Sequence, residues 1–120
     1  MKSVLTVDDS PSIRQMVRLV LSQAGYDVTE AGSGSEGLAK ASAKRFDMVV
    51  TDLNMPGMNG LALIRELRAL SSFKGVPIVF LTTESDPAIK QEAKAAGATG
   101  WMTKPFQKDQ LLAVVQKFLG

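Results

Sequence analysis

The sequence predicts an α/β fold, a doubly wound five-stranded parallel sheet in which five strands alternate with five helices. Strand-like and helix-like patterns alternate along all 120 residues without a repeat or a linker. Such alternation is typical of a parallel sheet with helices on both faces and right-handed crossovers. Polar residues also follow directly after the buried strand patterns, namely Asp8, Asp9, Asp52, Thr82 and Lys104. In a parallel sheet they meet at the carboxyl edge, where open α/β sheets bind ligands.

The first helix has the clearest signals. Ser10 followed by Pro11 is typical of an N-cap with proline at the first helical position, and Gly25 is expected to end the helix. Between them, apolar residues recur at the spacing of one buried helical face, namely Ile13, Met16, Val17, Val20, Leu21 and Ala24.

The other elements are predicted from apolar runs between turn residues. The strand over 47–52 is the most apolar and is expected at the centre of the sheet, whereas the strand over 26–30 is more polar and is expected at an edge. In chain order the rest are a strand over 3–7, a helix from Ser35 to about Lys44, a helix carrying Leu63, Leu67 and Leu70, a strand over 76–81, a helix from Pro87 through Ala96, a strand over 99–103, and a last helix carrying Leu111, Val115, Phe118 and Leu119.

Composition argues against several classes of function. The net charge is only +2, and the scattered basic residues form no basic face of the kind that nucleic-acid binding needs. The chain has no cysteine, which excludes disulfides and thiolate metal sites, and no histidine, so any phosphohistidine must come from a partner. No apolar run approaches the ~20 residues of a membrane span, and no signal peptide follows Lys2. A cytoplasmic protein is expected.

The polar residues at the strand ends predict a site for a divalent cation and a phosphoryl group. Asp52 stands alone after the central strand and is the natural nucleophile for an aspartyl phosphate. Asp8 and Asp9 supply carboxylate oxygens of the kind that Mg²⁺ prefers. Lys104 offers a point charge to a phosphoryl group, and Thr82 offers a hydroxyl donor.

With those residues placed, the chain resembles response-regulator receiver domains over essentially its whole length, and single-domain chemotaxis response regulators most of all. The resemblance rests on four motifs at strand ends, in order: Val7-Asp8-Asp9-Ser10, Thr51-Asp52-Leu53-Asn54-Met55-Pro56-Gly57-Met58-Asn59-Gly60, Leu81-Thr82-Thr83 and Lys104-Pro105-Phe106. It implies a flavodoxin-like strand order of 2-1-3-4-5, which belongs to this family's fold and is not worked out from the spacing. It also implies a cis Lys104-Pro105 bond.

The resemblance further implies a role for each site residue. Asp52 is the expected phosphoacceptor for a sensor histidine kinase, with Thr82 and Lys104 contacting the phosphoryl group. Asp9, Asp52 and the backbone carbonyl of Asn54 are expected to bind Mg²⁺ directly, and Asp8 through water.

Three residues are implied to tune or report the switch. Asn54 and Glu84 correspond to positions beside the path of the attacking water. Trp101 stands where the family usually has Tyr or Phe, an aromatic whose pose follows the threonine. Its simplest alternative is a half-buried anchor on the last strand.

The implied function is that of a stand-alone response regulator of a two-component system, a single receiver domain over 1–120. Its enzymatic activity is expected to be limited to self-phosphorylation from small donors and autodephosphorylation. The helix over 87–96 has a thin apolar face, so this helix, the strand over 99–103 and residues 107–118 are expected to bind a downstream target, such as a flagellar switch protein. The neat ends of the chain favour a stand-alone protein.

Several alternatives stay open. The chain could be a phosphorelay intermediate or a receiver excised from a longer regulator. A haloacid-dehalogenase-type phosphatase wants a second acid two residues after its nucleophile, where this chain has Asn54. A flavodoxin-like carrier would place a phosphate against Asp8 and Asp9, which would repel it. Taken singly, each residue has an ordinary structural explanation. Asp8 and Asp9 could be an acidic pair at a helix N-terminus, favoured by the helix dipole, and Asp52 could form a turn. Thr82 could be an ordinary strand residue, and Lys104 a solvated surface lysine.

Overall fold

A five-stranded parallel sheet runs through the centre of the computed structural model, which describes residues 1–83 and 86–119. The strand order is β2-β1-β3-β4-β5, so the predicted fold class and strand order are confirmed. The elements are β1 Ser3–Val7, α1 Pro11–Gln23, β2 Asp27–Ala31, α2 Gly34–Ala43, β3 Met48–Asp52, α3 Gly60–Arg68, β4 Ile78–Thr82, α4 Pro87–Ala96, β5 Gly100–Thr103 and α5 Lys108–Leu119.

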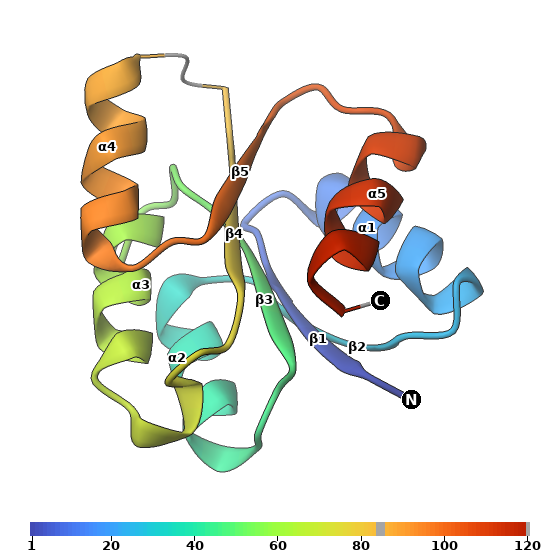
Figure 1. Cartoon of the computed structure of the whole chain (residues 1–120), viewed down its shortest axis with the longest axis horizontal. Helices are drawn as coiled ribbons and strands as arrows, with labels where there is room; N and C mark the ends of the chain where they lie inside the picture. Colours follow the sequence, from blue (N-terminus) through green and yellow to red (C-terminus); the bar gives the residue numbers. More distant parts are fainter. Residues whose placement is uncertain (84–85, 120) are drawn as a thin grey trace.

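The helices form two layers, one on each face of the sheet (Figure 1). α1 and α5 pack together on one face, while α2, α3 and α4 lie in a row on the other. Each layer closes over its own apolar core, because alternate strand residues point to opposite faces. Leu5 and Val49 belong to the core under α2 to α4, whereas Val4 and Val50 belong to the core under α1 and α5.

Burial follows the predicted pattern. β3 and β4 are buried at every position, as expected for the middle of a sheet, and the more polar β2 is at an edge. Ala93 is the one fully buried residue of α4 within the described part of the chain, so the expectation of a thin apolar face on this helix is confirmed. Among the residues described, no helix is long and apolar enough to cross a membrane.

Two predicted details are wrong. Leu70 does not extend α3, because this helix ends at Arg68 and the chain forms a 3₁₀ turn, Ser71–Phe73, that buries Phe73 in the core. Ala24 does not belong to the buried face of α1. It is exposed as the C-cap, with its N–H donating back to the carbonyl of Leu21 before Gly25 turns the chain at φ +96°.

Some boundaries also shift. The strand expected over 76–81 begins at Ile78, and Pro77, which has no N–H to donate to a ladder, precedes it. The strand expected over 26–30 runs from Asp27 to Ala31, since the N–H of Tyr26 donates to Leu21 at the end of α1. The predicted caps are confirmed. Ser10 accepts from the N–H of Ile13, and Asp86 accepts from that of Ala88 at the start of α4.

Candidate functional site

The candidate site lies at the carboxyl edge of the sheet, where four strands end side by side. Val7 of β1 is in register with Thr51 of β3, and the next residue, Asp52, with Leu81 of β4. Thr82 and Thr103 are in register at the ends of β4 and β5. The parallel ladder therefore brings the residues that follow each strand to one edge of the sheet.

Three carboxylates converge at this edge. Oxygen atoms of Asp8, Asp9 and Asp52 all lie within 4.8 Å of one another. Asp8 and Asp52 are buried, at 1% and 5% exposed, whereas Asp9 is exposed to solvent. The cluster is thus closed toward the sheet and open on the Asp9 side.

One ammonium group balances the two buried carboxylates. Lys104 Nζ lies 3.2 Å from Oδ2 of Asp8 and 3.3 Å from Oδ1 of Asp52. Its side chain is only 14% exposed, so solvent screens these ion pairs less than at an open surface. The bond from Lys104 to Pro105 is cis, and the backbone N–H of Lys104 donates to the carbonyl of Thr82.

The environment of Asp52 favours its neutral form. Burial raises the pKa of Asp52 above its ordinary value, and the charge of Asp8 raises it further. Lys104 and the backbone N–H of Asn54, which donates to Oδ1 at 3.3 Å, oppose this rise. A second cation at the open side would relieve the same crowding of negative charge.

Backbone donors hold the two buried carboxylates in place. The N–H of Ser10 donates to Oδ1 of Asp8 at 2.9 Å, in the turn that leads into α1. The N–H of Asn54 does the same for Asp52. Each carboxylate is therefore fixed by the loop that follows its own strand.

The structure brings Thr82 and Asn54 to the same sheet edge, whereas Trp101 lies in the groove between α4 and β5. Thr82 is fully buried at the end of β4, and Asn54 is exposed just after Asp52. Trp101 of β5 is 49% exposed, stacks on Phe80 with ring centroids 6.5 Å apart, and has Lys90 Nζ 4.7 Å above its ring. Glu84 lies outside the described residues.

Sequence reasoning missed the role of Gly60. A Cβ at this first residue of α3 would collide with the backbone carbonyl of Asp52 and the Cα of Leu53. Gly60 also donates its N–H to the carbonyl of Leu53. The glycine thus lets α3 start directly against the acidic strand end. The turn-rich loop before it was the available signal, but it did not indicate this contact.

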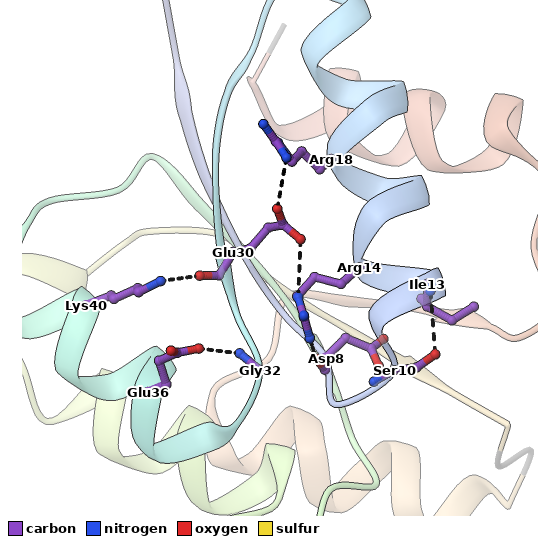
Figure 2. Close-up of polar contacts among 9 residues, drawn as sticks. All are labelled: Asp8, Ser10, Ile13, Arg14, Arg18, Glu30, Gly32, Glu36 and Lys40. Atoms are coloured by element: carbon purple, nitrogen blue, oxygen red, sulfur yellow. Dashed lines mark hydrogen bonds and ion pairs between the residues drawn. The ribbon is translucent and has the colours of Figure 1, made fainter.

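A second missed group lies beneath the turn between β1 and α1. Figure 2 shows Arg14 pointing from α1 toward Asp8 and Glu30. Its Nη1 donates to the backbone carbonyl of Asp8 at 2.7 Å, and its Nε donates to Glu30 Oε1 at 3.2 Å. Arg18 pairs with the other oxygen of Glu30 at 3.3 Å. Nothing in the local sequence pattern separates Arg14 from an ordinary exposed helix residue.

Comparison with known proteins supplies the family. The sequence model described as the response regulator receiver domain matches residues 4–116. The chain is similar to chemotaxis protein CheY1 of Helicobacter pylori, with 40% identity over 98% of this chain and 96% of that protein. It is also similar to the DNA-binding response regulator MtrA of Mycolicibacterium smegmatis, with 41% identity over 94% of this chain. The chain spans only 48% of that regulator's length.

Solved structures show the same fold. The structure of chemotaxis protein CheY4 of Vibrio cholerae matches with a TM-score of 0.96 and 51% identity, covering 99% of each chain. The receiver domain of the sensor histidine kinase PA1611 of Pseudomonas aeruginosa matches with a TM-score of 0.89 and 27% identity, covering 98% of this chain and 96% of that one. That structure has a magnesium ion coordinated in its active-site cleft.

Proposed function

The chain belongs to the response regulator receiver domain family, and from this premise we propose that it is a stand-alone response regulator phosphorylated on Asp52 by a sensor histidine kinase. The observation that carries the proposal is the cluster of three carboxylates closed on one side by Lys104. It is a signalling protein, not a metabolic enzyme. We further propose a single receiver domain over 1–120, located in the cytoplasm.

The donor set fits Mg²⁺. Three hard oxygen ligands lie within 4.8 Å of one another, with Asp9 on the solvent side, and Mg²⁺ is bound in proteins by one or a few carboxylates together with waters and phosphate oxygens. We assign Asp9, Asp52 and the Asn54 carbonyl as direct ligands and Asp8 as a ligand through water. When bound, the cation neutralises charge on the phosphoryl oxygens during transfer.

Each side chain of the site has its own role in the phosphoryl transfer. An Asp52 oxygen attacks phosphorus while the bond from phosphorus to the donor's imidazole nitrogen breaks, which leaves an aspartyl phosphate. The ammonium of Lys104, which lies beside Asp8 and Asp52 before transfer, then pairs with the phosphoryl group. The hydroxyl of Thr82 donates a hydrogen bond to the same group. In autodephosphorylation a water attacks the same phosphorus while the bond from phosphorus to the Asp52 oxygen breaks, which releases inorganic phosphate and restores the carboxylate, and Asn54 flanks the path of this water.

The signal is read, in this proposal, on the surface of α4, β5 and α5. A groove of about 460 Å³ between α4 and β5 is lined by Lys90, Lys94 and Trp101, among others. The exposed ring of Trp101 and the lysines favour a partner segment that is acidic and carries an apolar anchor. Replacing Lys90, Lys94 or Lys108 should weaken binding to the target. Unchanged affinity in all three variants would argue against this surface.

A role in chemotaxis, with a flagellar switch protein as target, is supported by the similarity to two chemotaxis proteins over nearly their whole length. The second candidate is a receiver that belongs to a longer regulator, which the half-length match to MtrA favours. A phosphorelay intermediate would use the same site but pass its phosphoryl group to a second histidine protein.

The experiment is to incubate the protein with acetyl phosphate and Mg²⁺ and to follow intact mass and the fluorescence of Trp101. One phosphoryl adduct, absent from Asp52→Asn and from the EDTA sample, is expected. A fluorescence change that accompanies the adduct would link the site to the proposed output surface. An adduct with silent fluorescence would retain the phosphoacceptor and remove Trp101 as the switch, whereas an adduct that persists in Asp52→Asn would contradict the proposal.

A further inference from the structure

We propose that Arg14, oriented by Glu30, is a positioning residue for Mg²⁺ binding, because it fixes the peptide that joins Asp8 to Asp9. This inference rests on the proposed function and assigns a role to residues that neither the sequence motifs nor the cation ligands include. The juxtaposition on which it depends is drawn in Figure 2, where the guanidinium of Arg14 lies between the turn and Glu30.

The position of Asp9 depends on its backbone. Among the described residues, none hydrogen-bonds or pairs with the Asp9 carboxylate, and Asp9 is exposed. The other carboxylates are held by donors of their own, Lys104 and a backbone N–H for each. Whatever fixes the peptide before Asp9 therefore decides where its carboxylate lies relative to the rest of the cluster.

Two bonds hold the backbone on either side of Asp8. In the peptide before it, the N–H of Asp8 donates to the carbonyl of Ala31 at 3.1 Å, continuing the ladder one residue beyond β1. The carbonyl of Asp8 accepts from Arg14 Nη1 at 2.7 Å, the short length of a charge-assisted hydrogen bond. Without Arg14, only the turn closed by the N–H of Ser10 on the Asp8 carboxylate restrains the peptide between the two aspartates, so the direction of Asp9 is less firmly fixed.

Glu30 fixes the guanidinium in turn. It accepts from Arg14 Nε at 3.2 Å, so the guanidinium plane is held by one acceptor on β2 and another at the end of β1. Glu30 also neutralises the charge of Arg14, which would otherwise oppose a divalent cation nearby. The arrangement resembles the outer-shell partners that orient metal ligands, whose removal costs about 10- to 100-fold in metal affinity.

Charge and positioning predict opposite results, so they can be separated. Arg14→Gln removes a positive charge near the site, and electrostatics alone would then tighten Mg²⁺ binding. Loss of the Asp8 carbonyl contact would instead weaken it. Arg18 provides a matched control, because it lies on the same helix and pairs with the same Glu30 but is 61% exposed.

The test is calorimetric titration of the full chain with Mg²⁺. Arg14→Gln should bind about tenfold more weakly than the parent, Arg14→Lys should recover part of the loss, and Arg18→Gln should match the parent. In a protein that already carries Asp9→Asn, Arg14→Gln should lower the affinity for Mg²⁺ little further. A general loss of structure caused by Arg14→Gln would instead lower the affinity in both backgrounds. Urea midpoints in EDTA report on folding separately.

The outcomes separate the two proposals. If the parent binds Mg²⁺ and Arg14→Gln binds as tightly or more tightly, the positioning role is overturned and the proposed function stands. A tenfold loss that persists in the Asp9→Asn background would also overturn it. If the parent itself fails to bind Mg²⁺, both proposals are overturned.

Discussion

The ammonium of Lys104 lies 3.3 Å from Oδ1 of Asp52, joining the residue that follows β5 to the last residue of β3. The same ammonium reaches Asp8 after β1 at 3.2 Å. In this structure Lys104 is the counter-ion of two buried carboxylates that would otherwise repel each other. A phosphoryl group on Asp52 would compete with these carboxylates for the same charge, which gives phosphorylation a direct way to rearrange the sheet edge.

Removing this counter-ion should destabilise the protein. Lys104→Met leaves Asp8 and Asp52 buried without a cation, and breaking a buried ion pair on one side costs about 3 kcal/mol. We expect a lower free energy of unfolding in urea at neutral pH in EDTA, with a smaller deficit in Mg²⁺. Lys74→Met, at an exposed loop position, is the control. Equal midpoints for the two variants would show that Lys104 carries no such charge balance.

The raised pKa of Asp52 predicts the sign of a pH effect on stability. The folded state binds the proton of Asp52 more tightly than the unfolded state, so its contribution is fully present below the unfolded pKa of about 3.8 and is lost as pH rises through the folded pKa. Asp52→Asn removes this dependence. In EDTA we therefore expect the variant to gain stability over the parent as pH rises from 4 toward neutrality.

Asp47 provides a control of opposite sign. The backbone N–H of Ser3 donates to Asp47 and lowers its pKa, so this carboxylate stabilises the fold above its unfolded pKa and loses that effect as pH falls. Asp47→Asn should thus lose stability relative to the parent at neutral pH and approach it in acid. Urea titrations across this pH range measure the stability of each variant relative to the parent. If the relative stability of Asp52→Asn changes with pH in the same direction as that of Asp47→Asn, the assignment of a raised pKa to Asp52 is wrong.

Asp9 should matter for the cation more than for the fold. Because its side chain is exposed, Asp9→Ala should change the melting temperature in EDTA little, yet it should abolish most of the stabilisation by Mg²⁺. Ligand binding stabilises a folded protein in proportion to the logarithm of ligand concentration over Kd. Thermal melts across a Mg²⁺ series would measure this. A full Mg²⁺ shift in Asp9→Ala would exclude Asp9 as a ligand.

Gly60→Ala should disturb the site through the backbone. The added Cβ would press on the Asp52 carbonyl and on Leu53, so α3 must move away from the acidic strand end. Overpacking of this kind typically costs about 1–3 kcal/mol, which urea unfolding would detect. Gly25→Ala has open space around its Cβ and a positive φ, so it tests the effect of strain remote from the site. A wild-type stability for Gly60→Ala would contradict the close contact.

The fold and the placement of the polar residues could be read from the sequence because both depend on simple periodicity. Alternating strand and helix patterns define the architecture, and a polar residue directly after a buried parallel strand has to lie at the carboxyl edge. Asp8, Asp52 and Lys104 therefore meet as expected. The strand order came from the resemblance and is confirmed.

Contacts made by tertiary packing could not be predicted. Leu70 continues the helical spacing of α3, yet burial of Phe73 in a 3₁₀ turn ends the helix at Arg68. Arg14 and Arg18 lie on the same helix and pair with the same Glu30, but only the guanidinium of Arg14 also reaches the backbone carbonyl of Asp8. Neither the end of α3 nor the contacts of Arg14 leaves a periodic signal in the sequence, because each depends on packing against elements distant in the chain.

The most direct test of the central claim is to map the phosphoryl group after incubation with a phosphorylated histidine kinase and Mg²⁺. Borohydride would reduce an aspartyl phosphate to a homoserine residue, which peptide mass spectrometry can place in the sequence. The account predicts a single modified residue, Asp52, and none when EDTA replaces Mg²⁺. Modification at another residue, or none with a kinase that phosphorylates a control receiver in the same tube, would contradict it.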